Sequence, residues 1–304
     1  MPNSPSTIKA AVFPVAGLGT RFLPITKSSP KEMLSIIDKP IIQYAVEEAV
    51  AAGIKQLIFI TNATKRSLED YFDTNNELEQ HLLKQQKHEA LNEIQEIIPQ
   101  DVTCIYVRQK YPKGLGDAVL TAKNIVGKQA FAVLLADDVI ERHPQTKEYS
   151  LQQLLTEYKQ NKQSILSVEQ VPKSKTMQYG IVNPKTNLLA QDKHCFAIQG
   201  IIEKPAPDQA PSAFGVIGRY ILTPRIFHHL EQTPPGANNE IQLTDAIASL
   251  LQEEKVYACK LQTRRFDCGS KLGYLEAILS FGLKHHALKE DFSTLVKEYA
   301  AGIS

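Results

Sequence analysis

The feature that most constrains the fold is a short apolar segment near the N-terminus that runs into a glycine-containing loop. The run from Ala10 to Val15 is typical of a buried β-strand, and residues 16–20 follow it as a loop rich in small residues. Glycines at positions 17 and 19 let backbone N–H groups approach a bulky anion, because no Cβ atom stands in the way. The sequence therefore predicts a strand that delivers an anion-binding loop.

Two cations accompany the loop, since Arg21 follows it directly and Lys31 comes soon afterwards. Together they suggest a polyphosphate site. Two common phosphate motifs are excluded: the dinucleotide fingerprint needs a third glycine where Phe22 stands, and the P-loop needs Gly-Lys-Ser/Thr at the end of the loop. The loop alone is equally compatible with a tight turn and an incidental arginine, so the rest of the chain has to decide.

The composition is that of an ordinary globular protein. Of 304 residues, 43% are hydrophobic and 22% are charged, and the formal net charge is +1. This balance argues against a dedicated nucleic-acid or membrane surface. No apolar run approaches the roughly 20 residues of a membrane span, and Met1–Lys9 lacks the apolar centre of a signal peptide. We therefore expect a cytoplasmic protein with no nucleic-acid or membrane partner.

The cysteines are far apart in the sequence or lack metal-ligand spacing, and no CxxC motif occurs. They are Cys104, Cys195, Cys259 and Cys268. In a cytoplasmic protein this pattern predicts reduced thiols.

Hydrophobic periodicity predicts an α/β fold. An amphipathic helix from Pro40 to Gly53 and a buried strand from Leu57 to Thr61 follow the opening loop, which makes a βαβ unit with a parallel strand pair. Residues 63–98 are predicted to form a helical insertion, and residues 271–304 a helical end. The whole of 1–304 is expected to be one domain.

Acidic residues follow another predicted strand. Phe131–Leu135 is a buried apolar run, and it leads into Asp137 and Asp138. In open α/β sheets, ligands bind at the carboxyl ends of the strands, and paired carboxylates suit a hard cation such as Mg²⁺. A solvated turn or a helix cap is the competing interpretation.

The sequence pattern changes in the second half of the chain. Gly180–Val182, Ala197–Glu203 and Phe214–Leu222 are short predicted strands separated by Pro, Asn and Asp residues. They are typical of an antiparallel or mixed addition to a parallel sheet. The predicted fold class is thus α/β, with a mostly parallel mixed sheet flanked by helices and a small antiparallel addition.

The candidate residues favour phosphoryl or nucleotidyl transfer. The sequence contains no G-x-S-x-G motif, no Ser-His-Asp signature and no reactive-cysteine context. Cations combined with metal-binding carboxylates suit a reaction that depends on positioning and charge neutralisation rather than on a protein nucleophile.

Several short motifs together are more specific than any one of them. They are Ala16–Arg21, Pro30–Leu34 with Asp38–Pro40, Gln109 with Lys113–Gly116, Ile202–Pro205, Glu240–Ala246 and Asp267–Gly269. In this order, and spanning about residues 9–281, they resemble the bacterial UTP–glucose-1-phosphate uridylyltransferases (UDP-glucose pyrophosphorylases) of the sugar-phosphate nucleotidyltransferase family. Ser35 departs from that pattern, where a proline is expected. The loop with Asp137 and Asp138 varies among relatives, so the resemblance leaves open which acid is the metal ligand.

The resemblance implies a Rossmann-like nucleotide-diphospho-sugar transferase fold and a division of roles among the site residues. Residues implied to bind the nucleotide are Ala16, Gly17, Leu18, Gly19 and Glu32, with Gln109 and Gly114 at the uracil edge. Arg21 and Lys31 would bind the triphosphate and the departing pyrophosphate, and Lys204 the sugar phosphate; these are the implied catalytic residues. Gly180 and Glu203 would meet the sugar hydroxyls, and Asp137 and Asp267 would hold Mg²⁺.

The implied substrates are UTP and glucose 1-phosphate, and the implied assembly is a homo-oligomer, a dimer or a tetramer. A sugar phosphate is ionised near neutral pH, because its second pKa is about 6, so no general base is needed. Three alternatives remain: a thymidylyltransferase that uses the same sugar phosphate, a non-catalytic regulatory relative, and a nicotinamide-dependent dehydrogenase, which Phe22 disfavours.

Overall fold

The computed structural model describes residues 8–185, 194–236 and 239–302, so most of Met1–Lys9 lies outside the described residues. The strands are β1 (Ala10–Pro14), β2 (Ser35–Ile36), β3 (Lys39–Pro40), β4 (Gln56–Thr61), β5 (Thr103–Arg108), β6 (Phe131–Leu134), β7 (Asp138–Ile140), β8 (Ser164–Gln170), β9 (Gly180–Pro184), β10 (Cys195–Glu203), β11 (Phe214–Leu222), β12 (Val256–Lys260) and β13 (Arg265–Asp267). The helices are α1 (Ile41–Ala51), α2 (Arg66–Tyr71), α3 (Asn76–Lys84), α4 (His88–Gln95), α5 (Leu115–Thr121), α6 (Lys123–Val126), α7 (Ser150–Asn161), α8 (Ile226–Gln232), α9 (Leu243–Leu250), α10 (Lys271–Gly282) and α11 (Lys289–Ala301).

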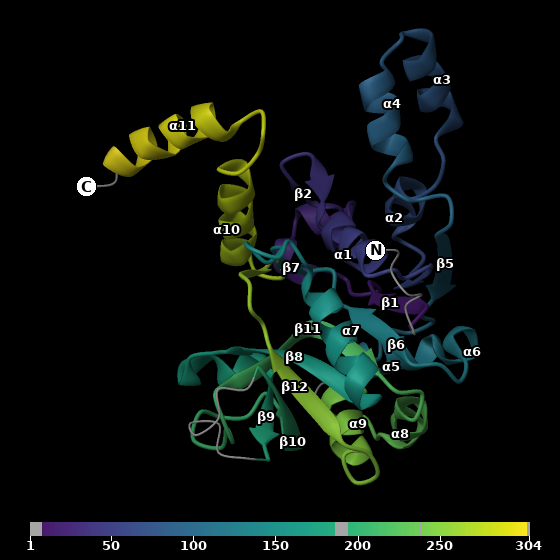
Figure 1. The fold of residues 1–304 in the computed structure, drawn as a ribbon, viewed down its shortest axis with the longest axis vertical. Coiled ribbons are helices and arrows are strands. Elements are labelled where there is room, and N and C mark those ends of the chain that lie inside the picture. Colours follow the sequence, from purple (N-terminus) through teal and green to yellow (C-terminus); the bar gives the residue numbers. More distant parts are fainter. Residues whose placement is uncertain (1–7, 186–193, 237–238, 303–304) are drawn as a thin grey trace.

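Helices cover both faces of one central sheet (Figure 1). Side chains alternate between the faces along each strand, so Ala11 and Phe13 of β1 pack with α1 and α7. Ala10 and Val12 face the other way and pack with α5, α8 and α9. This two-sided burial explains why the opening strand is apolar throughout.

The order of the strands sets the position of the site. In the described part of the chain the sheet has nine strands, ordered β5-β4-β1-β6-β11-β8-β12-β10-β9. The pairs β1–β4, β1–β6 and β4–β5 are parallel, which confirms the predicted βαβ unit. The chain leaves β1 on one side for β4 and later returns on its other side as β6. A crevice is expected at the carboxyl ends of strands at such a switch point.

The antiparallel strands continue the main sheet and do not form a separate layer. Strand β11 pairs antiparallel with β6 and β8, while β10 pairs antiparallel with β12 and β9. Strand β12 returns parallel to β8. The mixed α/β prediction is confirmed, and the antiparallel portion is larger than the small addition expected from the sequence.

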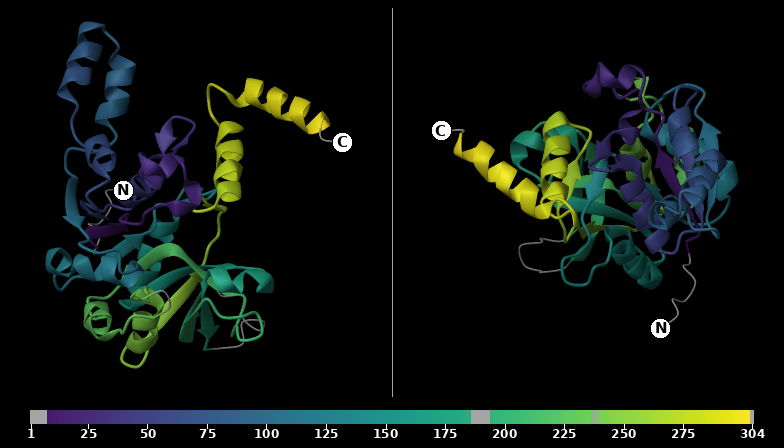
Figure 2. Two further views of the ribbon diagram at one scale, coloured as in Figure 1. Left: turned by 180° about the vertical axis from the view of Figure 1, so that it is seen from behind. Right: turned by 90° about the horizontal axis from the view of Figure 1, so that it is seen from above.

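The predicted insertion is helical and projects from the body. Helices α3 and α4 form an arm beside β5 (Figures 1 and 2). Leu78 and Leu83 of this arm are exposed. Helix α11 also stands away from the body (Figure 2) and has no buried side chain.

The expectation of reduced cysteines is wrong for one pair. Cys195 and Cys259 form a disulfide with a Cα–Cα distance of 4.1 Å. They are separated by 64 residues in the sequence, but β10 and β12 place them directly opposite each other in the ladder. Cys104 and Cys268 are free thiols.

Among the described residues, no helix is both long enough and apolar enough to cross a bilayer.

Candidate active site

The glycine loop starts at the switch point beside β1. Val15 donates to the backbone of Ile60, and Asn62 Nδ2 donates to the Ala16 carbonyl oxygen at 2.7 Å, so the end of β4 supports the loop. Gly17 faces open space, since a methyl group there would meet no other atom within 4 Å. Gly19 has a φ of 65°, a conformation that suits glycine. The loop thus leaves the backbone accessible to a ligand.

Two lysines behind this loop have different surroundings. Lys31 Nζ lies 2.5 Å from Asp137 Oδ2 at a partly exposed position. Lys65 Nζ lies 2.7 Å from Glu32 Oε2, and Glu32 and Lys65 are 2% and 3% exposed. Burial lowers the pKa of Lys65 despite the opposing effect of Glu32. The structure therefore places Glu32 in a buried ion pair with Lys65.

Two carboxylates and an arginine converge on Gly269. A methyl group at Gly269 would lie 2.9 Å from Asp137 Oδ2 and 3.0 Å from Asp267 Oδ1. Arg21 Nη1 lies 3.5 Å from the Gly269 carbonyl oxygen. The Cys268 N–H donates to the Asp137 carbonyl at 2.8 Å, which fixes the turn after β13 against the end of β6. Residues far apart in the sequence thereby form one charged cluster.

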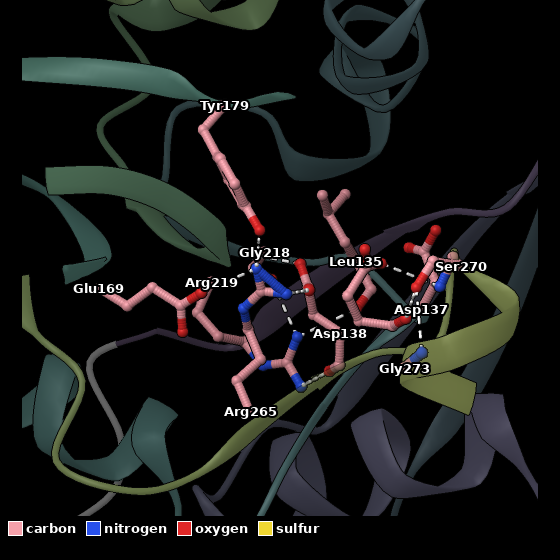
Figure 3. Close-up of polar contacts among 12 residues, drawn as sticks. Leu135, Asp137, Asp138, Glu169, Tyr179, Gly218, Arg219, Arg265, Ser270 and Gly273 are labelled. Atoms are coloured by element: carbon pink, nitrogen blue, oxygen red, sulfur yellow. Dashed lines mark hydrogen bonds and ion pairs between the residues drawn. The ribbon is translucent and has the colours of Figure 1, made fainter. Parts of the chain in front are cut away.

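The neighbouring Asp138 is held differently (Figure 3). Its Oδ2 accepts from the Gly218 N–H at 2.9 Å, and its Oδ1 accepts from Arg265 Nη1 at 2.9 Å. Burial raises the pKa of the Asp138 carboxyl to about 6, against the effect of Arg265. Burial also raises the pKa of Asp137, but the Lys31 ammonium outweighs it, so that carboxyl has a pKa below its ordinary value. Both carboxylate oxygens of Asp138 are thus hydrogen-bonded to other protein groups.

A buried arginine supports the strand ends beneath the cluster. Arg219 is fully buried, and its guanidinium donates to the carbonyl oxygens of Leu135 and Asp138. Its Nη2 lies 2.8 Å from Glu48 Oε2 of α1. The arginine therefore fixes both ends of the short segment that carries Asp137.

The predicted sugar-binding residues meet on β9 and β10. Gly180 lies opposite Glu203 in the ladder, and a methyl group at Gly180 would come within 2.5 Å of Thr244 Cγ2. Thr244 Oγ1 donates to Glu203 Oε2 at 2.8 Å, and Lys204 Nζ lies 3.3 Å from Glu203 Oε1. Only glycine leaves space at position 180, so this wall of the site is tightly packed.

A cavity of about 610 Å³ joins these two groups, a size typical of small-molecule sites. The predicted site residues that line it are Arg21, Asp137, Gly180, Glu203, Lys204 and Asp267. A larger cavity of about 860 Å³ lies between α1, α4 and the end of α10, and no predicted site residue lines it.

The predicted uracil-reading residues lie at the end of β5, outside the lining of the 610 Å³ cavity. The Gln109 N–H donates to the Thr61 carbonyl. Gly114 has a φ of 96° and packs closely on Glu240 and Ile241. The structure therefore separates two regions: the ends of β1, β4 and β5 for the predicted nucleotide contacts, and the cavity for the acids and the sugar contacts.

The donor set at Gly269 fits Mg²⁺. Within the described ranges no group of three or more His, Cys, Asp or Glu side chains could hold a metal ion. Asp137 and Asp267 supply carboxylate oxygens only, and Mg²⁺ is commonly held by one or two carboxylates, with water and substrate phosphates as the other ligands. The pair suits a cation that binds together with a phosphate.

Sequence reasoning missed several supporting residues. Asn62 directly follows a predicted strand, Lys65 lies four positions after its end, and Arg265 precedes Asp267 by two positions, so proximity to motifs was an available signal. Arg219 and Glu48 carried no such signal, because each lies in the middle of an ordinary strand or helix.

Comparison with known proteins adds a family assignment. Residues 11–281 match the family described as nucleotidyl transferase. Over 295 residues the chain is 43% identical to a UTP–glucose-1-phosphate uridylyltransferase of Haemophilus ducreyi, an alignment that covers 96% of this chain and 99% of that protein.

Solved structures are similar over nearly the whole chain. A UTP-bound UGPase from Acinetobacter baumannii is 46% identical, with a TM-score of 0.88 and coverage of 96% of this chain and 99% of that one. A UDP-glucose pyrophosphorylase complexed with UDP-glucose is 44% identical, with a TM-score of 0.82 and coverage of 91% and 100%. The similarity in sequence and the similarity in fold therefore both extend over more than nine-tenths of this chain.

Proposed function

The chain belongs to the nucleotidyl transferase family, and we propose that it transfers UMP from UTP to α-D-glucose 1-phosphate, giving UDP-glucose and pyrophosphate. The observation that carries this proposal is the convergence of Arg21, Asp137 and Asp267 on Gly269, in the cavity that Glu203 and Lys204 also line. The similar proteins named for this activity, and those solved with UTP or UDP-glucose, support it.

In the proposed reaction, a phosphate oxygen of glucose 1-phosphate attacks the α-phosphorus of UTP. A new P–O bond forms while the bond between the α-phosphorus and the α–β bridging oxygen breaks, and pyrophosphate leaves with that electron pair. The attacking phosphate is mostly ionised at neutral pH, because its second pKa is about 6. The protein therefore needs no general base, and its task is to bring two anions together.

The protein's cations lie where they can offset this repulsion. Lys204 is on the sugar side of the cavity, beside Glu203, and is half exposed. Arg21, at the end of the glycine loop, lines the same cavity beside Gly269. Lys31 pairs with Asp137, and its ammonium group would also attract the phosphates of a bound triphosphate. Such fixed charges stabilise a transition state without having to reorganise.

Asp137 and Asp267 would hold Mg²⁺ in this proposal. When bound, the ion would neutralise phosphate charge and orient the α-phosphate. Both carboxylate oxygens of Asp138 already accept hydrogen bonds from the protein, which supports Asp137 rather than Asp138 as the metal ligand.

We also propose a homo-oligomer in the cytoplasm. Leu272, Leu275 and Leu279 form one exposed apolar row on α10, and exposed apolar patches of this kind mark protein contacts. The cytoplasmic location comes from the sequence, and the Cys195–Cys259 disulfide is the feature that fits it least, because cytosolic thiols are usually reduced.

The test is a pyrophosphate-release assay on the purified full chain with UTP, glucose 1-phosphate and Mg²⁺. We expect stoichiometric pyrophosphate and UDP-glucose, loss of both with EDTA, and recovery on addition of excess Mg²⁺. No release under any condition would overturn the proposal and favour a non-catalytic regulatory relative. Equal or better use of dTTP at limiting concentration would instead identify a thymidylyltransferase.

A further inference from the structure

The amide of Gln109 has a fixed partner that the proposed reaction leaves unexplained. Gln109 Nε2 donates to Asp117 Oδ2 at 2.6 Å and lies 3.4 Å from the Gly114 carbonyl oxygen. Gln109 is 7% exposed at the end of β5, and Asp117 lies in the first turn of α5. Both partners of this nitrogen are oxygen atoms.

The chemistry of the partners fixes the orientation of the amide. An ionised carboxylate and a backbone carbonyl can only accept hydrogen bonds, so the amide must turn its NH₂ group to them. Gln109 Oε1 is therefore directed away from Asp117, and it has no hydrogen-bond partner among the described residues.

The frame that holds Asp117 is tightly packed. The Gly116 N–H donates to the Ile241 carbonyl at 2.8 Å, and the Ile241 N–H donates to the Lys113 carbonyl at 2.7 Å. A methyl group at Gly114 would lie 2.8 Å from Glu240 Cβ. These contacts restrict movement of the loop. The backbone that carries Asp117 is therefore held in place, and its carboxylate can orient the amide of Gln109.

We propose that Asp117 is a positioning residue that sets base specificity, by making Gln109 present an acceptor oxygen to the nucleobase. The proposal rests on the proposed function, since it assumes that Gln109 faces the base of a nucleoside triphosphate. The chemical class selected is an imide base. Uracil and thymine carry a donor at N3–H, which pairs with Oε1, whereas cytosine has an unprotonated acceptor nitrogen at that position. Asp117 acts through Gln109 and does not touch the substrate.

The test compares UTP and CTP on Asp117→Asn. Asparagine is nearly isosteric, but it offers Gln109 either a donor or an acceptor, so the Gln109 amide is free to turn. We expect the ratio of kcat/KM for UTP to that for CTP to fall about fivefold or more, the scale of one hydrogen bond. The loss for UTP should appear mainly in KM, because a base contact is similar in the ground state and the transition state.

Asp101→Asn is the matched control, because it makes the same chemical change in an exposed acid that pairs with Lys55. It should leave the UTP-to-CTP ratio unchanged. The ratio compares two nucleotides on one preparation, so a misfolded fraction cancels from it. An unchanged ratio in Asp117→Asn would overturn the inference.

Equilibrium binding of UTP and of CTP, measured by calorimetry without sugar phosphate, separates this inference from the proposed function. If the wild type prefers UTP and releases no pyrophosphate, the proposed function fails, and the binding ratio of Asp117→Asn still decides the role of Asp117. If the wild type binds the two nucleotides equally, the inference is wrong whatever the activity.

Discussion

Arg265 Nη1 lies 2.9 Å from Asp138 Oδ1, across the antiparallel pairing of β13 with β7. The same guanidinium lies 3.0 Å from Glu169 Oε1 and donates to the Tyr179 hydroxyl at 3.1 Å (Figure 3). This contact satisfies Asp138 within the protein and fixes the strand that ends in Asp267. As a result, the adjacent Asp137 and Asp138 have different environments: Asp138 is bound by Arg265, whereas Asp137 lies close to Gly269 together with Asp267.

The first prediction concerns these acids. Asp137→Asn and Asp267→Asn should each lower kcat at least about 100-fold, the scale of one lost electrostatic contact in a transition state. Asp138→Asn should instead lower the free energy of unfolding by about 1–3 kcal/mol, because whichever way the amide turns, its NH₂ would face one of the two buried donors, Gly218 N–H or Arg265 Nη1. Pyrophosphate release and urea unfolding measure the two effects. Loss of turnover in Asp138→Asn with normal turnover in Asp137→Asn would show that the ligand assignment is wrong.

The second prediction concerns Lys204. Lys204→Ala should raise KM for glucose 1-phosphate about tenfold or more, the scale of a charged hydrogen bond, and should change KM for UTP much less. Alanine retains a Cβ atom, so the left-handed backbone at φ 45° is equally strained in both proteins. Lys255→Ala removes an exposed lysine that does not line the 610 Å³ cavity, and it serves as the control. Unchanged sugar-phosphate kinetics in Lys204→Ala would contradict the assigned role.

The third prediction concerns the buried pair of Arg219 and Glu48. Their side chains are 0% and 1% exposed. Removing one partner of such a pair leaves an uncompensated charge, so Glu48→Ala should lower the free energy of unfolding by about 3–5 kcal/mol. Glu231→Ala removes an exposed partner of Lys123 and should cost less than about 1 kcal/mol. Urea titrations of both variants give the comparison, and equal stabilities would show that Arg219 is compensated elsewhere.

The fourth prediction concerns assembly. On α10, Leu272, Leu275 and Leu279 are 78%, 60% and 42% exposed, while Gly273 and Ala277 face the body. Placing charges in this row with the double substitution Leu272→Glu and Leu275→Glu should reduce the mass measured by light scattering. Lys271→Glu, at an exposed position that is already polar, should leave the mass unchanged. A wild-type chain that is monomeric at micromolar concentration would refute the proposed oligomer.

Much of the fold follows from local patterns. The apolar run at β1, the amphipathic stripe of α1 and the apolar run at β4 each fix a local conformation, and the βαβ topology follows because parallel neighbours need a crossover. The antiparallel portion was underestimated, because short strands separated by turn residues do not reveal which partners they will find. Strand β11 illustrates this, since it connects β6 to β8 across the centre of the sheet.

The candidate site was accessible to sequence reasoning where chemistry-bearing residues directly follow strands. Asp137 and Asp138 could be nominated on that basis, because the carboxyl ends of parallel strands lie at one sheet edge. Gln109 was implied by the resemblance alone. The ion pair that Glu32 forms could not be predicted in the same way. Its buried partner Lys65 lies 33 residues away in the sequence, and no local sequence pattern predicts that contact.

The sequence by itself determined the opening strand, the glycine loop and the residue types that can handle phosphates, because these depend on side chains close together in the chain. Only the tertiary structure decided that both carboxylate oxygens of Asp138 are bound by other protein groups, since its partner Arg265 lies 127 positions away in the sequence. It also decided that Cys195 meets Cys259, because strand register brings them together. Local preference sets the conformation of a segment, whereas long-range packing sets which of its polar groups are already satisfied.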